Sequence, residues 1–105
     1  MKELFTACAQ ILEGAEDVVM ISIINQAGSA PRTAGSKMLV KRDGTIVGTI
    51  GGGVFEAQAL TMAQEVFRGG QSATRRFTFS CNDVAGMDMI CGGKAEIFVD
   101  LLRHD

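Results

Sequence analysis

Three short segments carry the residue types that could do chemistry, namely GSAPR at residues 28–32, GGG at 51–53 and CGG at 91–93. The glycines at 51–53 follow a strand-like run and precede a helical pattern. Backbone N–H groups without side chains would therefore gather at a helix N-terminus, where a negative charge is favoured. A phosphate group is the first ligand that this arrangement suggests.

The segment at 28–32 adds a cation to this arrangement. Pro31 fixes one backbone dihedral angle and restrains Ala30, so the turn can hold Ser29 and Arg32 in place. The guanidinium of Arg32 offers a planar fork of donors that suits a phosphate or a carboxylate. The competing interpretation is structural: an exposed arginine beside a turn, and a triple glycine that only makes a tight connection from strand to helix.

Cysteine and histidine usage limits the chemistry further. Cys91 lies on an irregular segment beside Gly92, where the backbone can approach a ligand, so it is the best reactive candidate. Cys8 falls on the apolar stripe of a helix and is predicted to be buried, and Cys81 is assigned a structural role. The single histidine, His104, is next to the last residue, so no base adjoins Cys91. Neither a metal site nor a disulfide framework is expected.

Composition excludes several classes of protein. A chain of 105 residues with 47% hydrophobic and 21% charged residues has the size and balance of one globular domain. The net charge is -2 and the basic residues are scattered, which argues against a nucleic-acid surface. No apolar run approaches the ~20 residues needed to cross a bilayer, and the first residues lack a signal-peptide pattern. We therefore expect a cytoplasmic protein.

Hydrophobic periodicity predicts the elements that position the three segments. Helical patterns cover residues 4–12, closed by Gly14, and the stretch from the triple glycine to Gly69. An irregular loop is expected at 81–93, and Glu56, in the first turn of the second helix, is interpreted as a cap. The stretches with strand patterns are 18–24, 37–41, 45–50, 74–80 and 95–102, with a hairpin turn at Asp43-Gly44.

This order of elements predicts an α/β fold, with α+β as the alternative. We expect a single domain over residues 1–105, built from a mixed sheet of about five strands and two main helices. Residues 18–24 form a continuous, β-branched apolar run, which is typical of a central strand covered on both faces.

Taken together, the three motifs resemble the N-terminal domain of the XdhC/CoxI family over almost the whole chain. They read GSAPRTAGSKMLV, DGTIVGTIGGG followed by Glu56, and MICGGKAEIFVDLL. Members of this family are accessory factors that mature molybdenum hydroxylases such as xanthine dehydrogenase. The resemblance implies a chaperone, rather than an enzyme, that binds molybdenum cofactor. This cofactor, a molybdopterin with a terminal phosphate, would be carried, sulfurated with a cysteine desulfurase and delivered to a molybdenum hydroxylase client.

The resemblance also implies roles for particular residues. Those that would line the anionic or pterin portion of the cofactor are Ser29, Arg32, Gly51, Gly52 and Gly53. Cys91, with Gly92 beside it, would be the thiol nearest the molybdenum or its transferred sulfur. Longer members continue into a C-terminal Rossmann-like domain, which we do not expect in this chain. The resemblance then implies either a stand-alone single-domain relative or half of a system whose Rossmann-like half is a separate partner protein. A homodimer is a further expectation.

Two other functions stay open at this point. One is a small thiol-dependent sulfur-transfer or redox protein centred on Cys91. The other is a module that binds a phosphorylated ligand or a partner protein without doing chemistry, in which the glycines are only turns.

Overall fold

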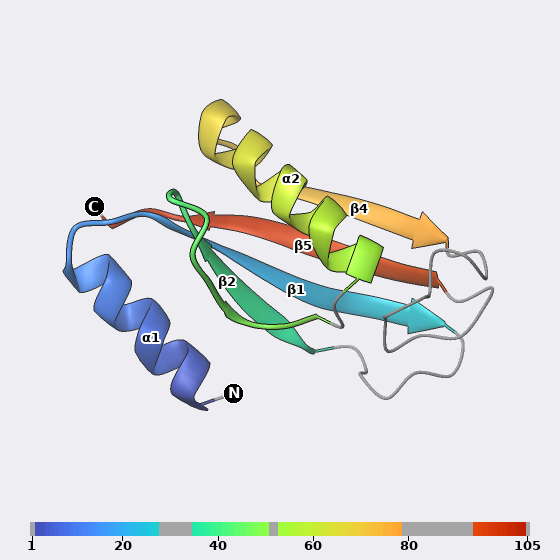
Figure 1. The fold of residues 1–105 in the computed structure, drawn as a ribbon, viewed down its shortest axis with the longest axis horizontal. Coiled ribbons are helices and arrows are strands. Elements are labelled where there is room, and N and C mark those ends of the chain that lie inside the picture. The colour runs from blue at the N-terminus through green and yellow to red at the C-terminus, as the bar shows by residue number, and fades with distance from the viewer. Residues whose placement is uncertain (1, 28–34, 51–52, 79–93, 105) are drawn as a thin grey trace.

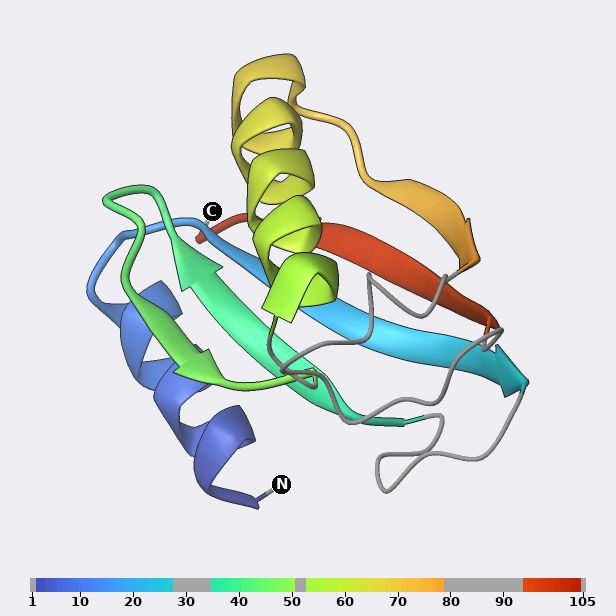
Figure 2. The same ribbon diagram turned by 45° about the vertical axis from the view of Figure 1, so that its right-hand side comes forward.

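The computed structural model describes residues 2–27, 35–50, 53–78 and 94–104. Its elements are α1 (Lys2–Glu13), β1 (Val18–Ala27), β2 (Lys37–Lys41), β3 (Ile46–Gly48), α2 (Gly53–Gly69), β4 (Ala73–Thr78) and β5 (Lys94–Leu102). The strands form one sheet in the order β3-β2-β1-β5-β4, and the helices pack on its two faces (Figures 1 and 2). The predicted α/β class, the five strands and the two helices are confirmed.

The strand directions differ from the expected mixed sheet, because all four pairings are antiparallel. A parallel pair needs a crossover between neighbouring strands. Here α2 provides a crossover, but it carries the chain from β3 at one edge of the sheet to β4 at the other. The strand at 18–24 is central, as predicted. Val19, Ile21 and Ile23 are buried in the core on the α2 side and Val18 in the core on the α1 side, whereas Ile24 is 48% exposed.

Two hydrophobic cores lie on either side of the sheet. The larger core lies under α2, where Phe55 packs edge-on against Phe77 with 5.3 Å between ring centroids. The smaller core lies under α1 and joins Cys8 to Val18 and Leu39. Cys8 is buried, as predicted, and the loss of hydration raises the pKa of its thiol.

The hairpin between β2 and β3 forms at the predicted turn. Gly44 has φ +90°, a conformation in which glycine is favoured over residues with a Cβ. The Asp43 carboxylate accepts the N–H of Thr45 at 2.9 Å, which closes the turn. This hydrogen bond explains why an aspartate precedes the glycine.

The end of α1 lies where Gly14 predicted it, but the left-handed residue is the next one. Ala15 has φ 63°, its N–H donates to the carbonyl of Leu12, and the N–H of Glu16 donates to that of Ile11. This pair of bonds defines a Schellman motif with Ala15 at the position that usually holds glycine. Gly14 is therefore one residue too early for the role that favours glycine.

Candidate functional site

Among the predicted site residues, the structure describes Gly53. Ser29, Arg32, Gly51, Gly52, Cys91 and Gly92 lie outside the described residues, as does the expected loop at 81–93. Gly53 is the first residue of α2, it is exposed, and its φ is +62°. A side chain at this position would be strained, so the conformation itself calls for glycine where the helix begins.

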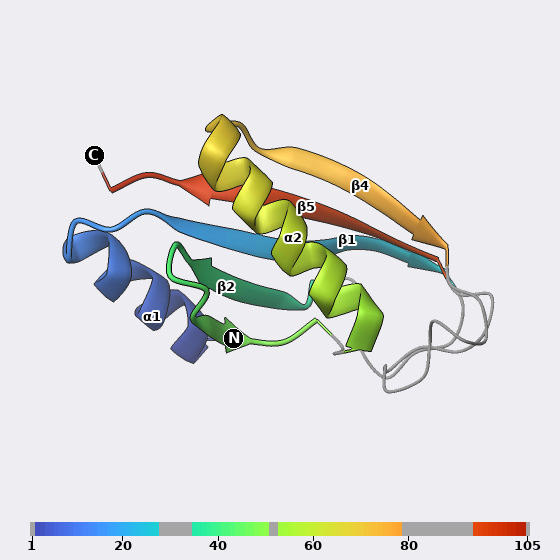
Figure 3. The same cartoon turned by 45° about the horizontal axis from the view of Figure 1, so that its top comes forward.

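The described residues that flank the first and third motifs pair at one end of the sheet. Ala27 at the end of β1 pairs with Lys94 at the start of β5, and Lys94 pairs with Thr78 at the end of β4. Helix α2 begins towards the same end (Figures 1 and 3). The first and third motifs are therefore carried by connections that start and end at this end of the sheet, and the helix that follows the triple glycine begins towards it.

Glu56 connects the start of α2 to the chain that precedes the triple glycine. Its Oε1 accepts the hydroxyl of Thr49 at 2.5 Å and the backbone N–H of Ile50 at 3.2 Å. The interpretation of Glu56 as a reaching-back carboxylate is thus correct, but the amide that it binds precedes the glycines. These bonds hold Ile50 and the first turn of the helix together across residues 51–52.

A pocket of about 400 Å³ opens between the first turn of α1 and the β2–β3 hairpin. Its lining residues are Glu3, Leu4, Ser36, Lys37, Val47, Gly48 and Thr49. At Gly48, φ is +86° and a Cβ would lie 3.0 Å from both Leu4 Cδ1 and the carbonyl oxygen of Lys37. Conformation and space therefore both exclude a side chain from this wall of the pocket.

Sequence reasoning missed this pocket, although Ser36 and Lys37 lie inside the first family motif. A hydroxyl and a cation directly after a glycine-containing turn were the available signal. The contribution of Glu3 could not be found in the same way, because α1 packs against residues of the hairpin that are distant in the sequence.

Comparison with known proteins decides the family. The sequence profile of the XdhC and CoxI family matches residues 11–78 of this chain. The chain belongs to the XdhC and CoxI family. The resemblance carried by the three motifs is thereby confirmed.

Two relatives of this XdhC/CoxI chain are much longer than it is. The uncharacterized protein YqeB of Escherichia coli (strain K12) is 30% identical over 98 residues, which is 93% of this chain and 18% of that protein. A crystal structure of a xanthine dehydrogenase from Bacillus halodurans matches with a TM-score of 0.69 and 28% identity. That match covers 88% of this chain and 29% of the other.

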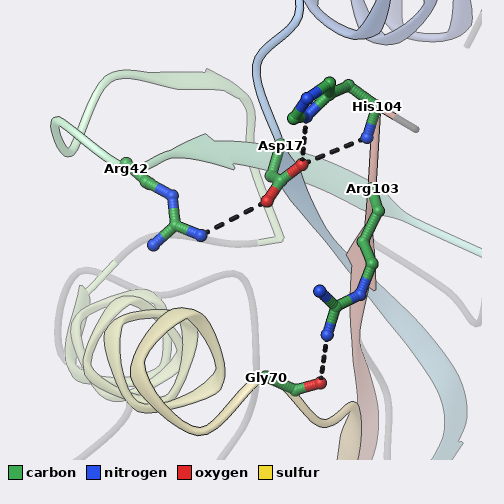
Figure 4. Close-up of polar contacts among 5 residues, drawn as sticks. All are labelled: Asp17, Arg42, Gly70, Arg103 and His104. Atoms are coloured by element: carbon green, nitrogen blue, oxygen red, sulfur yellow. Dashed lines mark hydrogen bonds and ion pairs between the residues drawn. The ribbon is translucent and has the colours of Figure 1, made fainter.

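In this XdhC/CoxI chain a second polar cluster lies where β1 begins, at the opposite end of that strand from Ala27 (Figure 4). Asp17 Oδ1 accepts the backbone N–H of His104 at 3.1 Å and lies 2.7 Å from His104 Nδ1. Asp17 Oδ2 accepts Arg42 Nη2 at 3.3 Å, and Arg103 Nη2 donates to the carbonyl of Gly70 at 2.9 Å. The cluster ties the residues after β5 to the start of β1 and to the end of α2.

The Asp17 cluster predicts a specific acid sensitivity. Hydrogen bonds, first from the His104 side chain, then from its backbone and from Arg42, lower the pKa of Asp17 from 3.8 to about 2. A carboxyl group whose pKa is lower in the folded state stabilises the fold above its unfolded pKa, and the effect is lost as pH falls through the folded value. The urea midpoint of the parent should therefore drop between roughly pH 4 and pH 2.

The measurement is urea unfolding followed by circular dichroism in steps across that pH range. Asp17→Asn removes the ionisable group, so its midpoint should be lower than that of the parent at pH 6 and should change less on acidification. Parallel curves for the two proteins would show that other carboxyl groups set the acid response.

Within the described ranges, no three His, Cys, Asp or Glu side chains lie close enough together to hold a metal ion. No helix in the same part of the chain is long and apolar enough to cross a membrane.

Proposed function

We propose that this chain is an accessory protein that binds molybdenum cofactor, assists its sulfuration and delivers it to a molybdenum hydroxylase. Membership of the XdhC and CoxI family supports this function. The observation that carries the proposal is the pairing of Ala27, Lys94 and Thr78, which flank the first and third motifs, at the end of the sheet towards which α2 begins. In this proposal the cofactor is cargo rather than a permanent part of the protein.

The described residues fit an anionic cargo. Helix α2 spans 17 residues and begins at the exposed Gly53, so the first residue of the helix places no side chain beside the partial positive charge of its N-terminus. Glu56 is the acidic residue in the first turn of α2, and its Oε1 is already bonded to Thr49 and Ile50. We assign the terminal phosphate to the glycines at 51–53 and to Arg32.

Energetics favour a carrier over a tight store. Hydrogen bonds to a charged group contribute about 1.5–3 kcal/mol each. Three or four of them at a phosphate would give roughly 5–12 kcal/mol, against a cost of ~4–15 kcal/mol for lost freedom on association. A moderate affinity follows, which suits a protein that must release its cargo to a client enzyme.

The decisive measurement is binding of molybdenum cofactor to the parent and to Arg32→Ala. The chain has no Trp or Tyr, so pterin absorbance and fluorescence are seen almost without background. Loss of one charged hydrogen-bonding partner should weaken binding about 10- to 100-fold. Arg68→Ala is the control, because Arg68 is exposed in the last turn of α2, far from Gly53 along the helix. Equal binding by Arg32→Ala and the parent would remove Arg32 from the site, and a parent that binds no cofactor would overturn the function.

The role of Cys91 is tested separately. Cys91→Ser should keep the affinity for the cofactor while losing sulfuration of the cofactor by a cysteine desulfurase and activation of the client enzyme. If the variant matches the parent in all three measurements, Cys91 has no part in the function. Repeated sulfur transfer by the parent without any client or cofactor would instead favour a thiol-dependent transfer enzyme.

A further inference from the structure

The pocket between α1 and the β2–β3 hairpin contains a lysine held in place by a buried hydroxyl. Lys37 Nζ donates to Ser22 Oγ at 3.1 Å, and Ser22 is only 6% exposed. An ammonium group has three N–H donors, and this bond uses one of them. The other two can be offered to a ligand in the pocket that Lys37 lines.

Lys37 also differs from its neighbours in its electrostatic surroundings. Lys41 lies on the same strand and the same face, and it pairs with Glu16 at 3.4 Å. Across the described residues, no carboxylate comes within ion-pair distance of Lys37. Because a half-buried charge without a counter-charge is unfavourable, an acceptor oxygen from a ligand would be stabilised there.

The other lining residues of the pocket indicate the shape and polarity of a ligand that would fit it. Leu4 and Val47 are apolar, and the absence of a side chain at Gly48 lets Leu4 pack closely against the hairpin backbone. Glu3 supplies a carboxylate, and its own backbone N–H together with the N-terminal ammonium lowers its pKa, so it is ionised at neutral pH. A fitting ligand is flat and apolar on its faces, with an acceptor oxygen and N–H donors on one edge.

We propose that this pocket binds the pyrimidine edge of a pterin ring. Lys37 donates to the ring oxygen, and Glu3 accepts from the ring N–H and amino groups. This assignment rests on the proposed function and identifies the part of the cargo that each site takes. Thr49 connects the two sites, because it lines the pocket and its hydroxyl is bonded to Glu56 near the start of α2.

The test uses 6-hydroxymethylpterin, which has the ring edge but neither phosphate nor molybdenum. Its fluorescence is followed on titration with the full chain. Lys37→Met should weaken binding about 10- to 100-fold, and Glu3→Gln should weaken it less because a neutral acceptor remains. Ser22→Ala should give an intermediate loss, since it releases the lysine without removing it. The corresponding lumazine, with oxygen in place of the amino group, should bind at least about tenfold more weakly than the pterin.

Matched controls are Lys41→Met, on the same strand and face as Lys37, and Glu13→Gln, at the other end of α1 from Glu3. Both should bind 6-hydroxymethylpterin like the parent. Equal affinities for Lys37→Met and Lys41→Met, or for the pterin and the lumazine, would overturn the assignment.

Failure of this assignment can be told apart from failure of the proposed function. If the parent, Lys37→Met and Glu3→Gln bind molybdenum cofactor equally well, the pocket does not hold the pterin and the function stands. If Lys37 and Glu3 are needed for the free pterin while no molybdenum cofactor is bound, the pocket assignment stands and the function falls.

Discussion

Phe55→Ala should lower the free energy of unfolding by about 3–5 kcal/mol. Phe55 lies in the first turns of α2, is 0% exposed, and meets the ring of Phe77 at an interplanar angle of 72°. Removing the ring leaves a cavity between helix and sheet and loses an aromatic pair worth about 0.5–1.5 kcal/mol. Since small domains are stable by only about 5–15 kcal/mol, this change removes a large fraction of the stability of the fold.

Urea unfolding monitored by circular dichroism measures this effect, because the chain has no Trp or Tyr to report by fluorescence. Phe5→Ala is the control, since Phe5 on α1 is 48% exposed. It should change stability by no more than about 0.5 kcal/mol. Similar losses for the two variants would show that α2 does not anchor the main core.

The periodicity of apolar residues predicted the elements well, because the spacing of apolar residues within a segment indicates which face of that helix or strand is buried. In β5, Ile97 and Val99 are buried while Glu96 and Asp100, on the other face, are partly exposed, as the alternation indicated. The hairpin could be predicted equally well, since Asp43 and Gly44 are residue types whose local backbone preferences favour a turn.

Features that depend on distant residues were not predictable in this way. The hydrogen bond between Asp17 and His104 joins residues 87 positions apart, and neither residue lies in a pattern that refers to the other. The all-antiparallel arrangement likewise depends on which edge of the sheet the chain joins after α2. Periodicity fixes which face of a strand is buried, but it does not fix its neighbours.

The candidate site was predicted from residue types that are unusual in themselves. Gly53 is where the triple glycine placed it, at the start of a helix and with positive φ. The pocket between α1 and the β2–β3 hairpin was not predicted, because its charged residues come from α1 and β2. Lys37 and Glu3 line the same pocket only once α1 has packed against the sheet that contains β2.

Glu56→Ala is expected to combine a loss of stability with a loss of cargo binding. The Glu56 carboxylate holds the Thr49 hydroxyl and the Ile50 amide, and hydrogen bonds to a charged group are worth about 1.5–3 kcal/mol each. Both partners are half-buried or buried, so neither regains full hydration when the carboxylate is removed. We expect a loss of roughly 2–4 kcal/mol in the free energy of unfolding.

The expected loss of cofactor binding follows from the position of Glu56 between Ile50 and the start of α2. Glu56 fixes Ile50 relative to Gly53, so its loss frees the connection that is proposed to hold the phosphate. Affinity for molybdenum cofactor should therefore fall, even at temperatures where circular dichroism shows the variant to be folded. Inorganic phosphate, used as a competitor of the cofactor, should become correspondingly less effective.

Two variants separate this role from a general weakening of α2. Glu65→Ala removes an exposed carboxylate from the same helix and should change neither stability nor binding. Glu56→Gln keeps an acceptor oxygen without the charge, so it should recover part of both losses. If Glu56→Ala unfolds and binds like Glu65→Ala, the connection between Ile50 and Gly53 is held by other contacts. The phosphate site would then have to be formed without help from the carboxylate.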